Sequence, residues 1–374
     1  MGLKHRFATL AVEATHVFVV ETPGAWRTRV AIEQEVTRRG WRLAMSAADA
    51  DALVVAGTPG PQLSERVETV WGQLPGPRSR AIITEDDPAA VRTVLDTAEA
   101  ELLDTPQQIR DARERDGFDP ENMPAADMDE SDPDGDDAMD MGGDMDMSPS
   151  GIPLAEGGED RDGLEMDELH VSLGPVLPFW PAGLVMRVTV QGDVVVAADA
   201  RVLDASDELS VHLEVNERAA LRCDQLAALL GLAGWADGHA AAVRVRDALI
   251  AGCDAESAAR LLDALHRTIR RRWLLRWSLR GIGDLPRDDE HEDGPCTRTG
   301  DVHDRLLGLI DGARSDLAGA GHREMLLSEL LALAERLVVG LDLATARLVV
   351  ASLSIDSGAV SAPATSAPKD AARG

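Results

Sequence analysis

The stretch that decides the fold is Glu168-Leu-His-Val-Ser-Leu-Gly-Pro-Val-Leu-Pro-Phe-Trp-Pro-Ala-Gly-Leu-Val-Met-Arg187, which continues as Val188-Thr-Val-Gln-Gly-Asp-Val-Val-Val-Ala-Ala-Asp199. Residues 184–190 and 194–198 are two β-rich runs joined by a short connection that contains a glycine. Because glycine adopts positive φ readily, the pattern predicts an antiparallel hairpin. The prolines and glycines of 174–183 predict an extended, non-helical loop before it.

The chain before this stretch alternates short apolar runs with amphipathic segments. Strands are expected near 15–20, 52–56 and 81–84, and helices over 26–39, 63–74 and 89–103. Such alternation is typical of a parallel sheet in an α/β layer structure. We therefore expect a small α/β domain over 14–104.

Residues 105–168 are predicted to form a disordered acidic linker. From Asp119 to Glu168 there are 19 acidic residues against one arginine, too much charge for too few apolar side chains to support a core. Met139, Met141, Met145 and Met147 lie among these carboxylates. Thioether sulfur suits Cu(I), so these methionines are a candidate copper site, and the alternative is that they are incidental in a solvated linker.

The chain after the hairpin reads as a helical body, giving an α+β domain over 169–355 in which a β-hairpin precedes a helical bundle. Helices are expected over 214–231, 240–252, 256–280, 301–317 and 324–339, and 343–354 fits helix or strand. In the 256–280 segment, apolar residues recur at spacings of three and four up to Trp273 and Trp277, which predicts one continuous amphipathic helix. The tail 356–374 is rich in Ala, Ser and Pro and is predicted to be disordered.

The loop and hairpin carry a recognisable order of residues. It resembles the start of the large, quinone-pocket subunit of proton-pumping NADH:quinone oxidoreductase (complex I), which is related to the large subunit of nickel–iron hydrogenases. That family reads L-H-V-N-L-G-P-Q-H-P-S-T-H-G before a hairpin, and the matching residues here are Leu169, His170, Val171, Leu173, Gly174, Pro175, Pro178 and Gly183.

The resemblance implies a ligand pocket at this loop. The candidate pocket residues are His170, Gly174, Pro175, Leu177, Phe179 and Trp180. In the family, a loop histidine and a helix tyrosine hydrogen-bond the quinone head. Here Leu177 stands at the first loop-histidine position, the second falls on Pro181 or Ala182, and the chain has no tyrosine. The two C-x-x-C pairs that nickel–iron chemistry needs are also absent.

The N-terminal domain is similar to the complex I subunit that carries the terminal iron–sulfur cluster. Residues 51–58 follow that family's D-x-L-x-V-x-G-T pattern, and 71–78 resemble its Y-D-Q-M-P-E-P-K. The family's cluster ligands are cysteines in the loops after the strands, but this chain has no cysteine before Cys223. Because such clusters are held mainly by cysteine thiolates, we expect none here.

Charge and cysteine usage narrow the function classes. A net charge of −29 argues against nucleic-acid binding, which needs clustered basic residues. Three separated cysteines fit a reducing cytosol, and no apolar run reaches the roughly 18 residues that span a bilayer. We expect a soluble cytoplasmic protein, or one at the cytoplasmic face of the membrane.

Two further groups of residues are candidate sites. Arginines are concentrated at 267–280. The candidate interaction site among them consists of Arg267, Arg271, Arg272, Arg276 and Arg280. Three interpretations of these arginines stay open: they form an ordinary solvated face, they bind the acidic linker of the same chain, or they face an acidic partner or anionic lipid. His291, Cys296 and His303 match no zinc spacing and are expected to be incidental.

These observations predict a protein without the catalytic residues of the family it resembles. The leading hypothesis is a non-catalytic fusion of the two subunit types, acting as an accessory, assembly or regulatory subunit with respiratory-complex subunits as partners. One alternative is copper binding through the Met-Asp linker. The other is a diverged oxidoreductase subunit that binds a quinone-like ligand between its domains, because fold alone does not carry function.

Overall fold

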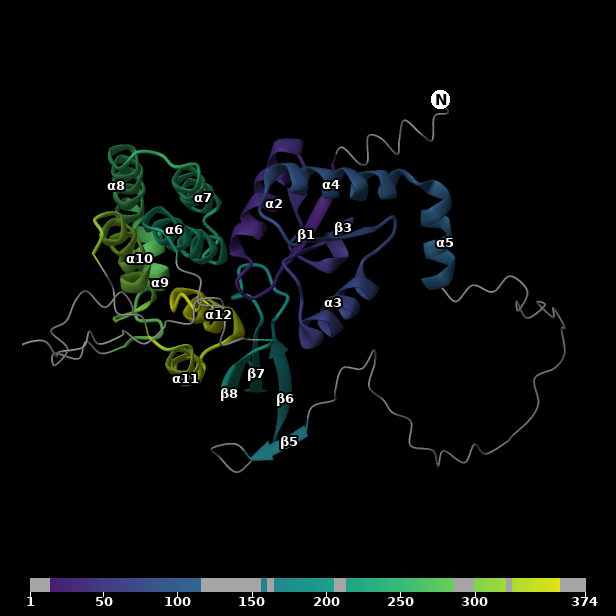
Figure 1. The fold of residues 1–374 in the computed structure, drawn as a ribbon. Helices are drawn as coiled ribbons and strands as arrows, with labels where there is room; N and C mark the ends of the chain where they lie inside the picture. Colours follow the sequence, from purple (N-terminus) through teal and green to yellow (C-terminus); the bar gives the residue numbers. More distant parts are fainter. Residues whose placement is uncertain are drawn as a thin grey trace, which may run out of the picture.

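The computed structural model describes residues 14–115, 156–159, 165–204, 213–285, 299–320 and 325–356. These residues form an α/β domain, followed by an antiparallel sheet and a group of helices (Figure 1). The predicted fold class is confirmed. Within the described residues, no helix combines the length and the apolar character that crossing a membrane requires.

The α/β domain is built on a parallel sheet with strand order β2-β1-β3-β4. Its strands are β1 (His16–Glu21), β2 (Arg42–Leu43), β3 (Ala52–Ala56) and β4 (Ser79–Ile83). Its helices are α2 (Trp26–Arg39), α3 (Pro61–Gln73), α4 (Pro88–Leu103) and α5 (Thr105–Arg115), with a short turn of 3-10 helix, η1 (Ala47–Asp49).

Alternating side chains of β3 face the two sides of this sheet. Ala52, Val54 and Ala56 lie in the core under α2 and α4, whereas Leu53 and Val55 lie in the core under α3. Because successive residues of a strand point to opposite faces, an unbroken apolar strand requires cover on both. The domain is therefore a three-layer α/β/α arrangement.

The predicted linker begins too early at residue 105, because Thr105–Arg115 is the helix α5. Asp111 accepts two hydrogen bonds from the Arg78 guanidinium, at 2.8 and 2.9 Å, and Gln108 bonds the Arg78 backbone at 2.9 Å. The contacts that hold α5 are polar, so its charged composition gave no sign of them. The candidate copper ligands Met139, Met141, Met145 and Met147 lie outside the described residues, as does the tail beyond 356.

The second sheet is antiparallel, with the order β5-β6-β7-β8. Its strands are β5 (Glu156–Glu159), β6 (Glu165–Leu173), β7 (Leu184–Gln191) and β8 (Val194–Val202). The predicted hairpin is β7–β8, which pairs Gln191 with Val194 across the turn. Two further strands join it, and they begin inside the segment predicted to be linker.

Seven helices follow within the described ranges. They are α6 (Val215–Leu232), α7 (Ala236–Ile250), α8 (Ala255–Arg271), α9 (Trp273–Leu279), α10 (Val302–Leu317), α11 (Leu327–Val338) and α12 (Leu343–Ser352). The segment 343–354, which fits helix or strand in sequence, is therefore helical. The predicted single helix 256–280 is wrong, because the backbone leaves the helical region at Arg272, where ψ is 85°.

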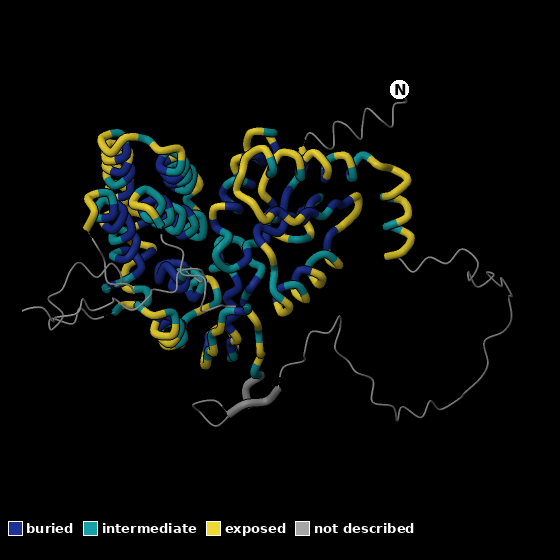
Figure 2. Tube along the Cα trace, viewed as in Figure 1, coloured by how far each residue is buried: buried dark blue, intermediate teal, exposed yellow. Residues whose placement is uncertain are grey.

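Helix α2 belongs to two cores at once. Its Ile32 and Val36 pack under the parallel sheet, whereas Trp26 and Val30 join the core built by the hairpin and the helices. In Figure 2 the buried residues accordingly run on from the α/β domain into the helical part. Two units that are far apart in the sequence thus share packed surface.

Candidate functional site

A cavity of about 320 Å³ lies where the two units meet. It is lined by β1, by α2, by the loop between β6 and β7, and by α6 and α7. The sheet order places the change of direction between β1 and β3, and ligands of open α/β sheets bind outside the carboxyl ends of strands at such a point. The volume falls at the lower end of typical small-molecule sites.

The loop that walls the cavity is held rigidly. Gly174 has φ of +79°, and a Cβ atom there would lie 2.3 Å from Trp180 Nε1 and 2.2 Å from the Leu184 carbonyl oxygen. The same indole donates a hydrogen bond to that oxygen at 2.7 Å. Phe179 stacks edge-on against His239, with ring centroids 5.3 Å apart. The apolar wall is therefore preformed, with glycine required at 174.

The polar side of the cavity is a network of two arginines and their carboxylates. Arg29 donates to Glu21, Glu33 and Asp224. Arg246 donates to Glu33 and Asp224, both at 2.7 Å. Because Arg29 and Glu33 belong to α2 while Asp224 and Arg246 belong to α6 and α7, the network ties the α/β domain to the helices. All five side chains line the cavity.

Burial changes the protonation of this network. Desolvation raises the pKa of Glu21 to about 7, with Asp224 adding to the rise and Arg29 opposing it. Burial alone would raise the pKa of Asp224, but Arg29 and Arg246 hold it below its usual value. One carboxyl at the cavity is therefore able to exchange a proton near neutral pH, beside one that stays ionised.

The structure brings together four of the six predicted pocket residues, since Pro175, Leu177, Phe179 and Trp180 all line the cavity. Gly174 lies behind them and supports the Trp180 ring. His170 lies elsewhere, exposed on β6, where its ring contacts the Thr189 hydroxyl at 3.1 Å.

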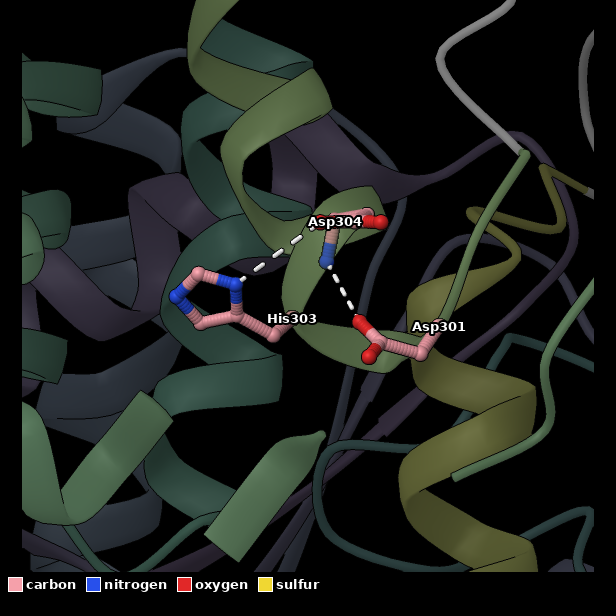
Figure 3. Close-up of side chains that lie close together, drawn as sticks. All are labelled: Asp301, His303 and Asp304. Atoms are coloured by element: carbon pink, nitrogen blue, oxygen red, sulfur yellow. Dashed lines mark hydrogen bonds and ion pairs between the residues drawn. The ribbon is translucent and has the colours of Figure 1, made fainter. Parts of the chain in front are cut away.

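A second cluster, at the start of α10, groups Asp301, His303 and Asp304 (Figure 3). Both Asp301 carboxylate oxygens already accept backbone N–H groups, from Gly281 and Asp304. Burial lowers the pKa of His303, and nearby Arg276 and Arg280 lower it further, against Asp301 and Asp304. The cluster thus caps a helix beside two cations, and the Asp301 oxygens already serve the backbone of that cap.

Two cysteines, Cys223 and Cys253, lie in the part of the chain that the structure describes. Burial raises the pKa of the Cys223 thiol to about 12, so it stays protonated at neutral pH. Cys253 is partly exposed and free. His291 and Cys296 lie outside the described residues.

The predicted arginine cluster divides between two helices. Arg267 and Arg271 lie on α8, Arg276 on α9, and Arg272 and Arg280 at the ends of α9; all five are exposed. The Arg272 guanidinium lies over the Trp235 ring, 5.2 Å from its centroid.

The charged network was missed in the sequence. Arg29 and Glu33 are spaced as any surface pair on a helix, and the other partner of Arg29, Asp224, lies 195 positions away. The only signal was Glu21, an acid at the start of the loop where the resembled family carries cysteine.

No protein-family model matches the chain, and no curated protein sequence does.

Proposed function

We propose that this chain is a non-catalytic, complex I-like binding protein that holds a quinone-like molecule between its two domains. In this proposal it works as an accessory subunit of a respiratory redox complex. The observation that carries the proposal is one cavity with two origins: its apolar wall is the loop that resembles the quinone-pocket subunit, and its polar side includes β1 of the domain that resembles the cluster subunit.

The chemistry of the cavity suits such a ligand. The Pro175, Leu177 and Phe179 side chains supply apolar contact for a ring and its tail. Glu21, with its pKa raised to about 7, offers a donor when protonated and an acceptor when ionised. A few polar groups set into an apolar wall are typical of sites that orient a small molecule.

The proposal is for binding and not for turnover. A family-type reaction needs a cluster to deliver electrons and a tyrosine beside the head group, whereas the chain has no tyrosine and no cysteine before Cys223. In this proposal the chain's own residues bind the quinone-like molecule, orient it and enclose it.

Titration with a short-chain ubiquinone tests the proposal. Trp26 and Trp180 both line the cavity, so binding should quench tryptophan fluorescence with saturation. Ala228→Phe places a ring in the cavity, since Ala228 lines it, and should weaken binding at least tenfold. The matched control is Ala264→Phe, at an exposed position of α8. Equal affinity in both variants, or linear quenching without saturation, would contradict the site.

The accessory role has a separate test. Tagged chain purified gently from its own cells should bring down respiratory-complex subunits in fixed ratio, and Ala228→Phe should leave that ratio unchanged. Recovery of the chain alone would contradict the accessory role without touching ligand binding. Stoichiometric copper on the same sample would instead support the linker methionines.

A further inference from the structure

Helix α9 presents three large hydrophobic side chains to solvent. Trp273 and Trp277 are each 74% exposed, and Leu274 is 58% exposed. Leu275 and Leu279, on the opposite side, are buried in the helical core. The break at Arg272 turns α9 out of line with α8, so the two indoles do not continue the buried stripe of Leu262, Leu265 and Ile269.

Arginines surround these exposed rings. On a helix, residues 273, 277 and 280 share one side, with 274 and 276 flanking them. We call this the α9 surface. Its members are Trp273, Leu274, Arg276, Trp277 and Arg280 on α9 or at its end, and Arg267, Arg270 and Arg271 at the end of α8.

The charge of the α9 surface is not neutralised by its described neighbours. Within the described ranges, none of its arginines forms an ion pair. Two of the acidic groups nearby are engaged elsewhere: Asp263 pairs with Arg314 at 2.6 Å, and Asp301 accepts two backbone N–H groups. A positive, aromatic surface thus stands out on a chain whose net charge is −29.

We propose that the α9 surface docks on an anionic lipid membrane. Indoles are favoured at membrane interfaces, where the ring is buried among headgroups and the N–H stays wet. Arginines beside them reach lipid phosphates and carboxylates. A short helix anchored on one side by Leu275 and Leu279 would lie in the interface and bury Trp273, Leu274 and Trp277.

The chain's own acidic segment fits the surface less well. Residues 119–168 offer the complementary charge, but they contain no aromatic residue. Docking them would satisfy the arginines and leave two indoles in contact with a polar chain. A lipid surface matches both the charge and the rings, and the membrane site does not depend on a ligand in the cavity.

Flotation of the full chain with vesicles tests this proposal. Vesicles of phosphatidylcholine with about one third phosphatidylserine should bind the chain, whereas pure phosphatidylcholine should bind it at least tenfold more weakly. Replacing both Trp273 and Trp277 by Ser should lower binding at least tenfold. Each of Arg276→Gln and Arg280→Gln should lower it by about fivefold. These side chains are exposed, so folding is expected to survive.

Matched controls use exposed positions elsewhere. Leu326→Ser removes another exposed apolar side chain, and Arg110→Gln removes another exposed arginine; neither should change vesicle binding. Equal binding by the tryptophan pair variant, or no preference for anionic vesicles, would overturn the proposal. Absence of binding by the full chain would also overturn it. Iodide quenching of Trp273 and Trp277 that then rises on deletion of 119–155 would assign the surface to the acidic segment.

Discussion

Arg29 of α2 donates a hydrogen bond to Asp224 of α6, across the boundary between the α/β domain and the helices. Asp224 also accepts from Arg246, at 2.7 Å, and so lies between two guanidinium groups. Arg246 is only 2% exposed. The position of one domain on the other is therefore fixed by buried charges at the same place where the cavity forms.

Replacing Asp224 by Asn should destabilise the whole chain. The change removes one carboxylate between the buried guanidinium group of Arg246 and the partly buried one of Arg29, and breaking a buried ion pair costs roughly 3 kcal/mol or more. Urea denaturation followed by circular dichroism measures the loss. The control is Glu256→Gln, at the exposed pair with Arg260, where a cost below about 1 kcal/mol is expected. Similar costs at the two positions would contradict the buried network.

The stability of the chain should depend on pH through Glu21. Its folded pKa is raised to about 7, so the folded state holds this proton more tightly than the unfolded state and stability falls as pH rises from about 4.5 to 7. Between about pH 5 and pH 8, the free energy of unfolding of the wild type should fall by roughly 2 to 3 kcal/mol relative to that of Glu21→Gln.

The control for this pH effect is Glu35→Gln. Hydrogen bonds from Arg38, and then from Arg39, lower the pKa of Glu35 to about 2, against burial. The stabilisation that Glu35 provides is lost only as pH falls below about 4.5. The free energies of unfolding of Glu35→Gln and wild type should therefore change in parallel between about pH 5 and pH 8. If the difference in the free energy of unfolding between wild type and Glu21→Gln did not change with pH over this range, Glu21 would be ionised throughout it.

Gly174→Ala should be far more damaging than Gly234→Ala. Both glycines have positive φ, +79° and +73°, but a Cβ at 174 would collide with Trp180 and Leu184, whereas nothing lies within 4 Å at 234. Backbone conformation alone costs about 1 to 2 kcal/mol, and the collision at 174 should add about 1 to 3 kcal/mol more. Thermal melting measures both. Equal losses would mean that the loop moves freely.

Asp111→Ala should release α5 and leave the rest of the α/β domain folded. The carboxylate makes the two hydrogen bonds to Arg78 that hold this helix. Hydrogen exchange should speed up over Thr105–Arg115 and not in β1 or β3. Glu114→Ala, at an exposed position of the same helix, should change nothing. Unchanged exchange in Asp111→Ala would show that these two bonds do not hold α5, and fast exchange over Thr105–Arg115 already in the wild type would restore 105 as the start of the linker.

Much of the local structure could be predicted, because apolar periodicity decides it. The bounds of α2 and β3 follow from their patterns, and the hairpin follows from Gly192 between two β-rich runs. The resemblance to the quinone-pocket subunit marked the loop of the cavity wall as a pocket, whereas its prolines and glycines predicted only its extended path. These are short-range effects that a sequence displays directly.

What could not be predicted depends on contacts between distant residues. Nothing in the sequence pairs Arg29 with Asp224, or Arg78 with Asp111, because polar contacts have no periodicity. The break at Arg272 was hidden for a related reason: Trp273 and Trp277 continue the apolar spacing, and only the three-dimensional packing shows that these indoles face solvent.

The most direct measurement of the central claim is photoaffinity labelling with an azido-quinone, followed by mapping of the labelled peptides. The account predicts label on 175–182 and on peptides of α6 and α7, reduced by excess short-chain ubiquinone and by Ala228→Phe but not by Ala264→Phe. Label that falls elsewhere, or that excess ubiquinone does not displace, would contradict binding between the two domains.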